Sequence, residues 1–499
     1  MKIKRKIPAV MFSQHPDHAN TPFWHNHPHI KTQDEIKECY LMFKELVGDE
    51  VMWDWEGKFA DEAVFEKLMM EYFDFFKEKP IGREFFLTFR VPNPNIESGY
   101  RLGRVFMVIL SAHHLAETSQ LHTPPLFEII LPMVESAGEM IKLQQYFAKI
   151  SKLARKFFGS NKKSVKKIEI IPIFEQVKTL LNSGKILREY FSIAKKKLGY
   201  VPLYFRPFCA RSDPALNSGI VPTTLAIKWA LSEYVKFSQE TKIPTYPIIA
   251  PGALPFRGGL TPQTVKQFIK EFKGIKTLVV QSAFRYDFPV AEVKKGVKMI
   301  QKEIGKYETE VLADDLGPKI LTVIPLFEIP YKKSVEKMAS LIQKVAKYIP
   351  KRRERVQHVG LFGYSRKVGE VSLPRAIGFT AACYSLGIPP ELIGTGRGLK
   401  AVKKTGQLKL VEKLYKNLKY SLTWAGRYLR RKSLKELGIT ELNQDVKFVE
   451  KYLGKKLGPK TAAEKKHEKL AGIILSKINK DQDPTEEIIK AAKIRRSLG

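Results

Sequence analysis

The stretch IEIIPIFEQVKTLLNSGKILREYFSIAKKK, residues 168–197, joins a short, nearly continuous apolar run to a longer segment with helical periodicity. The run 168–175 predicts a β-strand buried on both faces, as in a parallel sheet that helices cover. Residues 176–197 predict the helix that follows it, because apolar side chains recur every three to four positions. The strand therefore ends on Glu175, a carboxylate at the carboxyl end of a parallel strand.

The same unit of strand and helix recurs along the first four hundred residues. Further helices are expected over 60–78, 218–240, 262–273 and 289–306. Eight or nine such units in one chain of 499 residues favour an α/β fold of the (β/α)8 TIM-barrel type with many additional helices over a doubly wound open sheet. The expected strands are residues 51–57, 85–92, 126–133, 168–175, 203–213, 246–256, 277–284, 320–328 and 356–365.

The chain is predicted to divide near residue 400. Residues 1–400 are expected to form the barrel, including a histidine-rich segment near the N-terminus. Residues 401–499 contain no clear strand, and 408–437 and 461–479 have the pattern of basic amphipathic helices. This last part is predicted to be a basic helical extension that packs on the barrel.

Composition limits the class of protein. The formal net charge is +35, which suits an anionic partner and keeps nucleic-acid binding open. The excess is spread along the chain, so it fits anionic small substrates at least as well. The three cysteines lie far apart without CxxC spacing, which argues against a disulfide framework or a zinc module and favours a reducing, cytoplasmic compartment. No apolar stretch approaches the roughly 18 residues of a membrane span.

Charged residues stand at the ends of five expected strands. In a barrel the loops after the strand carboxyl ends build the active site, so these side chains should converge on one mouth. Guanidinium groups match carboxylate and phosphate oxygens, and paired carboxylates favour Mg²⁺ or Mn²⁺. The residues are Arg90, Glu175, Asp213, Arg257 and Arg285.

Several ordered blocks resemble one known family, the archaeal-type phosphoenolpyruvate carboxylases, from the N-terminus to about residue 400. Single blocks such as HP or RGG occur widely, but their order along the chain is specific. The blocks are SQHPD (13–17), MWDWEGK (52–58), FLTFRVPNP (86–94), FEIILPM (127–133), IPIFE (171–175), ARSDPALNSG (210–219), PFRGGLTP (255–262), QSAFRYDFP (281–289) and GYSRK (363–367) followed by GTGRGL (394–399).

The resemblance implies a defined reaction. Phosphoenolpyruvate and bicarbonate would give oxaloacetate and phosphate, through carboxyphosphate and an enolate that Mg²⁺ or Mn²⁺ stabilises. Members of the family usually assemble as homotetramers. His15 resembles the family's HP-motif histidine and would act as the base, Arg90 matches a catalytic arginine, and Arg257 with Gly258 and Gly259 matches the glycine-rich substrate loop.

The resemblance also implies a metal site. Glu175 and Asp213 stand where the longer enzymes of the family carry their metal carboxylates. The chain departs from those enzymes at Pro255, in place of a loop histidine, and at Leu216, in place of a lysine. The second departure puts in doubt any role for a cation at that position.

The sequence contains further arginines and a second PLFE motif, whose roles have to be considered separately. Arg285 is predicted to bind substrate, and Arg366 or Arg397 could take that role instead. The segment 394–399 could bind phosphate as a glycine-rich loop, a weak signal by itself. Glu328 repeats the sequence context of Glu175 but lacks the SDxA partner downstream, so it is expected to be structural.

Five of the ten histidines lie between residues 12 and 30. Beyond His15, the spacing of His25, His27 and His29 could chelate zinc or nickel from an extended segment. The default interpretation for these three and for His18 is a polar loop that helps to cover the active site.

Two rival functions stay open. Another lyase or aldolase of the phosphoenolpyruvate/pyruvate barrel superfamily would keep the metal carboxylates and an enolate, but would not need the phosphate-facing arginines or His15. A basic nucleic-acid-binding protein would explain the net charge, but not paired carboxylates at strand ends. Near the end of the first expected strand, Asp54 and Glu56 could contact the substrate or the residues around it.

Overall fold

Eight parallel strands close into a barrel in the order of the sequence, with β8 paired to β1. The computed structural model describes residues 6–56, 60–97, 100–121, 123–158, 165, 167–354, 366–368 and 371–499. The predicted barrel is confirmed, because an open sheet would leave β1 and β8 as unpaired edges. The barrel strands are β1 (Val10–Ser13), β2 (Glu50–Asp54), β3 (Phe86–Arg90), β4 (Glu128–Leu131), β5 (Glu169–Phe174), β6 (Phe208–Ala210), β7 (Ile248–Ala250) and β8 (Thr277–Val280).

Two separate apolar cores explain why these runs become strands. One core fills the inside of the barrel, and a larger one lies between the strands and the surrounding helices. Burial on both faces requires nearly continuous apolar sequence, as the strands have. The inner core consists of Met11, Met52, Ile130, Ile171, Ile173, Phe208, Ala210, Ile248, Ala250 and Val279.

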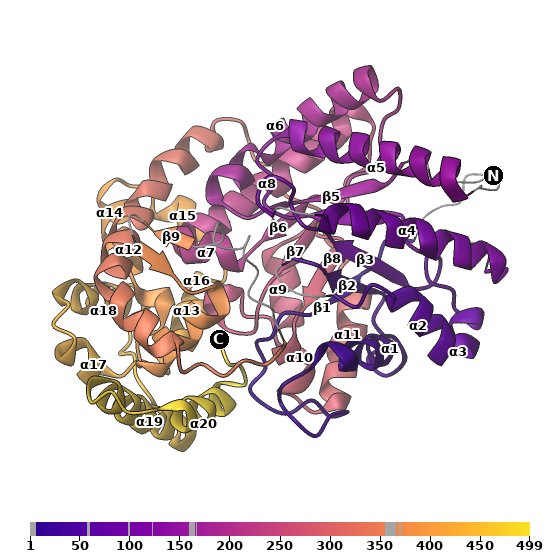
Figure 1. The fold of residues 1–499 in the computed structure, drawn as a ribbon. Coiled ribbons are helices and arrows are strands. Elements are labelled where there is room, and N and C mark those ends of the chain that lie inside the picture. Colours follow the sequence, from indigo (N-terminus) through magenta and orange to yellow (C-terminus); the bar gives the residue numbers. More distant parts are fainter. Residues whose placement is uncertain are drawn as a thin grey trace.

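Helices surround the barrel and form a second mass beside it (Figure 1). The helices up to α11 are η1 (Thr32–Asp34), α1 (Glu35–Lys44), α2 (Val64–Glu71), α3 (Phe73–Glu78), α4 (Arg101–Thr118), α5 (Ala137–Phe158), α6 (Val177–Lys197), α7 (Ser212–Ser218), α8 (Ile220–Thr241), η2 (Pro255–Arg257), α9 (Val265–Glu271), α10 (Ser282–Tyr286) and α11 (Val290–Glu303). The later ones are α12 (Leu316–Ala346), α13 (Ala376–Ser385), η4 (Pro390–Leu392), α14 (Thr395–Lys404), α15 (Leu408–Leu414), α16 (Leu418–Gly426), α17 (Arg431–Glu436), α18 (Thr440–Leu453), α19 (Ala462–Asn479) and α20 (Thr485–Arg495).

The strand prediction fails at two places. It omits β1, a four-residue strand that pairs with β2 and β8 and so completes the barrel. It also assigns a strand to 320–328, which lies inside the long helix α12. The expected strand 356–365 falls outside the described residues, and a small antiparallel pair, β9 (Arg366–Val368) and β10 (Val371–Leu373), follows it.

The apolar spacing of α12 accounts for the second error. Its buried side chains Ile320, Val323, Ile324 and Phe327 follow the helical period, while Leu321 between them is 57% exposed. A short apolar run that contains Pro325 and is followed by Pro330 resembles a strand end in isolation. Within a barrel already closed by eight strands, a ninth has no edge to join, and the segment packs as a helix against α8 and α14.

The C-terminal region is helical, and a domain boundary near residue 400 stays a prediction. This residue lies inside α14, and the helices beside the barrel already begin with α12. Helix α13 contacts α7 and α16 contacts η2, both of which follow barrel strands. The C-terminus itself returns to the centre of the molecule, between the helical mass and the barrel (Figure 1).

A buried ion network closes the opposite, amino-terminal end of the barrel. Arg206, which precedes β6, donates to Glu50 at the start of β2 (2.6 Å) and to Glu128 at the start of β4 (2.7 Å). It also donates to Thr277 Oγ1 at the start of β8 (3.1 Å). One guanidinium therefore ties together four strands inside the barrel.

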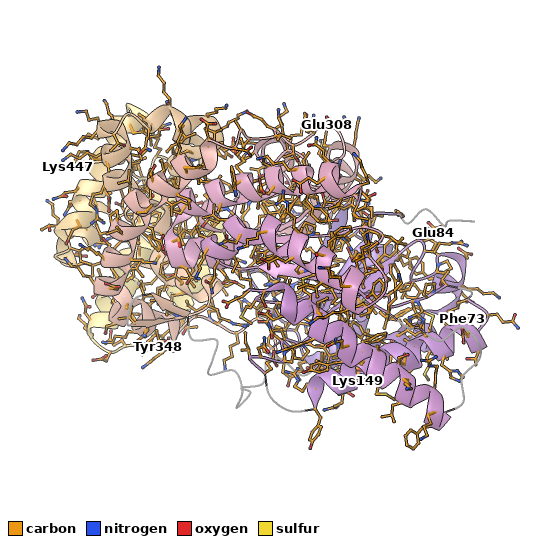
Figure 2. The ribbon with its side chains drawn as sticks, turned by 90° about the horizontal axis from the view of Figure 1, so that it is seen from above. Phe73, Glu84, Lys149, Glu308, Tyr348 and Lys447 are labelled. Atoms are coloured by element: carbon orange, nitrogen blue, oxygen red, sulfur yellow. The ribbon has the colours of Figure 1, made fainter. Side chains whose placement is uncertain are left out.

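Charged side chains project around the whole outline of the molecule (Figure 2). Lys149 on α5 and Lys447 on α18, for example, extend from different ends of it. Within the described part of the chain, no helix is both long and apolar enough to cross a membrane.

Candidate active site at the barrel mouth

The charged residues predicted at strand ends gather at one end of the barrel. Because all eight strands are parallel, their carboxyl ends open on the same mouth. His15 follows β1, Arg90 ends β3, and Glu175 follows β5. Asp213 lies in the first turn of α7 after β6, and Arg257 ends η2 after β7.

Arg90 is held by two buried carboxylates. Its Nε and Nη2 donate to the two oxygens of Asp54 at 2.9 and 2.6 Å, and its Nη1 lies 2.7 Å from Glu56. Burial opposes the charged form, but Asp54 and Glu56 outweigh it and keep the pKa of Arg90 well above its usual value. The guanidinium is therefore a fixed cation, and Asp54 and Glu56 contact it as the interpretation of the MWDWEGK block allowed.

Glu175 and Asp213 follow neighbouring strands. Phe174 on β5 pairs with Cys209 on β6, so the two carboxylates come after adjacent positions of the barrel wall. Glu175 is buried, and its charge contributes to the raised pKa of Arg90, which places these two side chains close together. Asp213 is partly exposed.

These two carboxylates fit a magnesium-type cation by their chemistry. Mg²⁺ in enzymes of phosphorylated substrates is often held by one or two carboxylates, with water and substrate oxygens as its other ligands. Among the residues whose positions are described, no group of three or more His, Cys, Asp or Glu side chains forms a complete protein cage. The assignment of Glu175 and Asp213 as ligands of such a cation stays a prediction.

Arg257 is almost fully buried and makes four polar contacts. Its Nη1 lies 3.0 Å from Asp17 Oδ2 and 2.6 Å from the main-chain oxygen of Gly499. Its Nε donates to Ser212 Oγ at 3.1 Å, and its Nη2 donates to Gln281. These partners come from the loops after β1, β6 and β8 and from the last residue of the chain, so Arg257 joins four separate segments.

Glycines shape the loop around Arg257. Gly258 and Gly259 have φ values of +124° and +74°, which L-residues with side chains rarely adopt. A Cβ on Gly258 would lie 2.5 Å from Pro251 Cβ, and one on Gly252 would lie 2.6 Å from Arg257 Cζ. The glycines thus allow the loop to fold tightly against this arginine.

His15 lies at the mouth and is the second residue after β1. Its Nδ1 is 2.8 Å from Ser13 Oγ, and its side chain is half-buried. Its carbonyl oxygen accepts from Asp17 N at 3.2 Å and from Ser282 N at 3.4 Å. The backbone around His15 is therefore fixed to the end of β8.

The other N-terminal histidines belong to a polar loop. His18 Nδ1 lies 2.9 Å from Ser282 Oγ and its Nε2 lies 2.8 Å from the Pro28 oxygen. Burial lowers the pKa of His18 to about 3, so its imidazole is neutral near pH 7. His25 Nδ1 faces the main-chain oxygen of His27 (2.8 Å), and His29 Nδ1 faces that of Lys351 (3.1 Å). A zinc or nickel site at His25, His27 and His29 finds no support in this described loop.

Arg285 makes its contacts with the barrel strands and a surrounding helix, and not at the open mouth of the barrel. It is fully buried, and its Nη1 donates to the main-chain oxygens of Ser13 (2.8 Å) and Val280 (3.0 Å). Its Nη2 lies 3.3 Å from Glu38 on α1, outside the barrel. These contacts connect β1 and β8 with the surrounding helix layer, and they do not bring Arg285 into the group around Arg257.

The alternative arginines and the second PLFE motif also lie elsewhere. Arg397 on α14 bonds both oxygens of Asp445 on α18, at 3.0 and 2.8 Å. The glycine-rich segment 394–399 therefore forms a helix contact. Glu328 lies on α12 and accepts from Ser218 Oγ at 3.2 Å, in the structural role expected. The side chain of Arg366 is outside the described residues.

Sequence reasoning missed the partners of Arg257. Asp17 stands in the QHPD block, yet nothing in its spacing points to an arginine 240 residues away. Ser212 is the second residue after β6 and Gln281 directly follows β8, so the rule that selected charged residues near strand ends would have found them if neutral polar residues were included. Gly499 has no comparable signal.

Comparison with known proteins gives the family. The family model described as phosphoenolpyruvate carboxylase matches residues 7–499. The chain belongs to the phosphoenolpyruvate carboxylase family. The match continues to the C-terminus, so the resemblance is not limited to the first four hundred residues as predicted, and it includes the helical region that contacts the barrel.

Individual relatives match the sequence of this chain over most or all of their length. A protein named phosphoenolpyruvate carboxylase from Oenococcus oeni is 36% identical and covers 100% of both chains. One of that name from Leuconostoc mesenteroides is 38% identical over 99% of each chain. An archaeal one, from Pyrococcus horikoshii, is 40% identical over 88% of this chain and 92% of its own. The interpretation as a phosphoenolpyruvate carboxylase is thereby confirmed. The two alternatives, another lyase or aldolase of the superfamily and a nucleic-acid-binding protein, are not favoured.

Comparison with solved structures adds little to the family assignment. A malate synthase of Haloferax volcanii in a lead(II) complex covers 68% of this chain and 86% of its own, with 11% identity and a TM-score of 0.38. Its complex with pyruvate and acetyl-CoA covers 83% and 97%, at the same TM-score and identity. Similarity at this level carries no functional information.

Proposed function

We propose that the barrel mouth converts phosphoenolpyruvate and bicarbonate to oxaloacetate and phosphate with Arg90, Arg257 and His15 as its reacting groups. The observation that supports this assignment is the convergence of two buried arginines and two carboxylates on one end of the barrel. Guanidinium groups bind the phosphate and carboxylate of the substrate, and fixed donors are more effective than mobile ones because they do not reorganise during the reaction.

Arg257 and its loop are assigned to the phosphoryl group. Bicarbonate oxygen attacks phosphorus, the bond from phosphorus to the enol oxygen breaks, and carboxyphosphate and the enolate of pyruvate result. Charge then develops on phosphoryl oxygens, which Arg257 would meet, while Gly258 and Gly259, whose N–H groups donate within the loop, would let the backbone approach the substrate closely. Arg90, held by Asp54 and Glu56, is assigned to the developing negative charge at the neighbouring position.

His15 is proposed as the base for the second half of the reaction. Removal of the carboxyl proton of carboxyphosphate releases carbon dioxide and phosphate, and the enolate carbon then attacks carbon dioxide. Histidine imidazole is the side chain most often used for proton transfer near neutral pH. The bond between His15 Nδ1 and Ser13 would orient the ring with Nε2 toward the mouth.

Glu175 and Asp213 would hold the divalent cation, Mg²⁺ or Mn²⁺. When bound, the metal would supply a Lewis acid for the enolate oxygen. Arg285, whose donors are bound to main-chain oxygens of β1 and β8, is assigned to positioning these strands in place of substrate binding.

A homotetramer in the cytoplasm is the proposed working state. The exposed apolar side chains of α5, Tyr146, Leu153 and Phe157, are 41%, 54% and 70% exposed and would be covered by a second copy of the chain. The three cysteines are unpaired and buried, which suits a reducing compartment. Light scattering of the purified protein would test the assembly.

The experiment that tests the mechanism measures both products. Oxaloacetate formation from phosphoenolpyruvate, bicarbonate and Mg²⁺ is coupled to malate dehydrogenase, with phosphate release followed in parallel and a control without bicarbonate. We expect equal, bicarbonate-dependent formation of both products in the wild type. His15→Ala should abolish oxaloacetate while leaving slow phosphate release, and exposed His114→Ala on α4 serves as the control. Normal oxaloacetate output from His15→Ala would exclude His15 as the base.

A further inference from the structure

Two side chains from outside the loop of Arg257 bond to the main chain of Phe256, the residue before this arginine. Phe256 N donates to Glu391 Oε1 at 2.6 Å, and Phe256 O accepts from Arg211 Nη1 at 3.2 Å. Within the loop, bonds such as that from Gly252 N to Arg257 O (2.7 Å) hold the turn together. The main chain of Phe256 is therefore a point at which other elements hold this loop.

Glu391 reaches the loop from the C-terminal helices. It lies in η4, after α13, and its side chain is completely buried. Its Oε1 also accepts from Tyr384 OH on α13 at 2.6 Å, so this oxygen is fixed between two donors. In the described part of the chain, its Oε2 has no hydrogen-bond partner. A single oxygen of Glu391 therefore makes both hydrogen bonds.

The bond to Phe256 requires an acceptor at this position more than it requires a negative charge. Burial raises the pKa of Glu391 to about 7, against the hydrogen bonds from Tyr384 and Phe256 and the charge of Arg211. The carboxyl group is therefore only partly ionised near neutral pH. Oε1 accepts hydrogen bonds in the charged state and also in the neutral state with the proton on Oε2.

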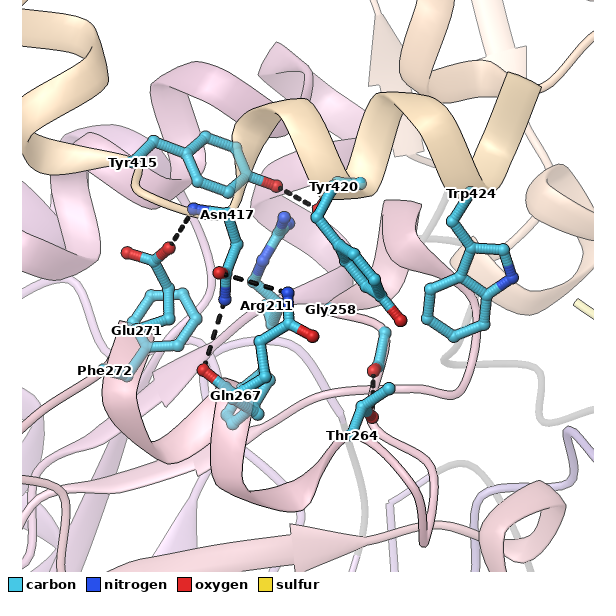
Figure 3. A pocket seen from close by; sticks show the side chains of 13 residues that line it. Arg211, Gly258, Thr264, Gln267, Glu271, Phe272, Tyr415, Asn417, Tyr420 and Trp424 are labelled. Carbon is cyan, nitrogen blue, oxygen red and sulfur yellow. Dashed lines mark hydrogen bonds between the residues drawn. The ribbon is translucent and has the colours of Figure 1, made fainter. Parts of the chain in front are cut away.

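Arg211 and Trp424 also contact the loop. Arg211 follows β6 and is 1% exposed, and Figure 3 shows it between Tyr415 and Gly258. Trp424 on α16 packs so closely on Gly259 that a Cβ added there would lie 3.1 Å from Cζ3 of its ring. Side chains from the barrel and from the C-terminal helices thus enclose the loop together.

We propose that Glu391 is a positioning residue for Arg257, which it holds in place through the main chain of Phe256. The inference rests on the proposed function, in which Arg257 meets the charge that develops on the phosphoryl group. The guanidinium end of Arg257 is fixed by contacts with the loops after β1, β6 and β8, and the bond from Phe256 N to Glu391 fixes the main-chain end. Both ends matter, because a displacement of about 1 Å at a reacting group can lower the rate roughly 100-fold.

Two substitutions separate the reach of Glu391 from its charge. Glu391→Gln keeps the length of the side chain and an oxygen acceptor, and removes the charge. Glu391→Asp keeps the charge, but it is one methylene shorter and draws the carboxylate away from Phe256 N.

Carboxylation kinetics of the full-length protein measure both variants. We expect Glu391→Gln to retain kcat within about threefold and Glu391→Asp to lose at least about tenfold, because only the second loses the bond to the loop. The KM for phosphoenolpyruvate should change less than about twofold in both, because Arg257 acts on charge that develops in the transition state. If Glu391 acted only as a negative charge, the order of the two variants would be reversed.

Glu450→Asp on α18 is the matched control. Glu450 Oε1 accepts from Leu457 N at the same 2.6 Å, and its partners Arg431 and Lys456 also lie in the C-terminal helices. Denaturant titration measures the stability of each variant, so that a loss of folded enzyme is not counted as a loss of kcat. We expect Glu450→Asp to change kcat less than about twofold.

Arg257→Lys separates this inference from the proposed function. Loss of turnover in Arg257→Lys together with full turnover in Glu391→Asp would overturn the positioning role alone. Full turnover in Arg257→Lys would overturn the proposed function, on which the positioning role depends. Equal losses of kcat in Glu391→Asp and Glu450→Asp would also overturn the positioning role. If Glu391→Asp fails to fold, Glu391→Gln still decides, because a loss of about tenfold or more in that variant contradicts an uncharged acceptor.

Discussion

Arg257 Nη1 lies 3.0 Å from Asp17 Oδ2, and both side chains are almost completely buried. The two residues are 240 positions apart in the chain and follow the seventh and first strands of the barrel. Asp17 also accepts from Ser282 Oγ and Ala283 N, at 3.0 and 2.7 Å, so its carboxylate is itself held in place. The closure of the barrel between β8 and β1 is what brings the HPD segment to this arginine.

Asp17→Asn removes the charge of this pair and keeps its shape. We expect kcat/KM for phosphoenolpyruvate to fall roughly 100-fold, since a small displacement of a positioning group can have this effect. Steady-state carboxylation kinetics measure it, and Asp315→Asn, at an exposed pair with Lys319, is the control. A variant with wild-type kinetics would show that Arg257 does not depend on Asp17.

In Arg90→Lys, a single ammonium group replaces the guanidinium group, which contacts both oxygens of Asp54. Because lysine cannot reproduce the bidentate geometry, turnover should fall by about 10²-fold or more. Arg188→Lys provides a matched control, since Arg188 makes the same forked contact with Glu240 between α6 and α8, far from the mouth. Similar losses in both variants would indicate a stability effect and not a role in the reaction.

Glu175→Gln and Asp213→Asn test the metal carboxylates. We expect the Mg²⁺ concentration for half-maximal carboxylation to rise by more than about 10- to 100-fold. That range is typical when a residue that hydrogen-bonds a metal ligand is lost, and loss of the ligand itself should have a larger effect. Glu328→Gln, in the second PLFE motif on α12, should leave the Mg²⁺ dependence unchanged. An unchanged Mg²⁺ titration for both site variants would remove the assignment.

Arg206→Met tests the network at the closed end of the barrel. The substitution leaves Glu50 and Glu128 buried without their counter-charge, so the free energy of unfolding should fall by about 3–5 kcal/mol. Denaturant titration measures this, and Lys319→Met, at an exposed ion pair, should change it by less than about 1 kcal/mol. The folded fraction of Arg206→Met should keep its turnover, because the network lies opposite the mouth.

His18 should make stability depend on pH. Its pKa is about 3 in the folded protein and about 6.5 when unfolded, so the folded state favours the neutral ring. Its stabilising contribution is present above pH 6.5 and is lost as the pH falls toward 3, by about 2 kcal/mol at pH 5. His18→Asn, which does not titrate, should lose less stability than the wild type between pH 7 and pH 5. Parallel pH profiles of the two proteins would contradict this.

The barrel and the location of its mouth were predictable because they depend on local patterns. Seven of the expected strands coincide with barrel strands, since a strand buried on both faces requires a continuous apolar run. The short strand β1 escaped prediction because four residues carry too weak a pattern, and α12 was misassigned because its apolar run is interrupted by prolines.

The candidate site residues were partly predictable for the same reason. A charged residue directly after a strand must lie at the mouth of a parallel barrel, which placed Arg90, Glu175, Asp213 and Arg257 at one end. His15 was found through the family resemblance instead, because β1 was not predicted. The same rule failed to separate Arg285, which also follows a strand but turns toward Glu38 in the helix layer. Position along the chain does not reveal the direction of a side chain.

The sequence by itself determined the eightfold alternation, the family and the end of the barrel at which the charged side chains meet, because these follow from periodicity and residue order. Only the tertiary structure decided which charges neutralise each other. Arg257 pairs with Asp17, and Arg90 pairs with Asp54 and Glu56. Such pairings depend on closure of the barrel and on the return of the C-terminal helices, which join residues hundreds of positions apart and therefore leave no local pattern in the sequence.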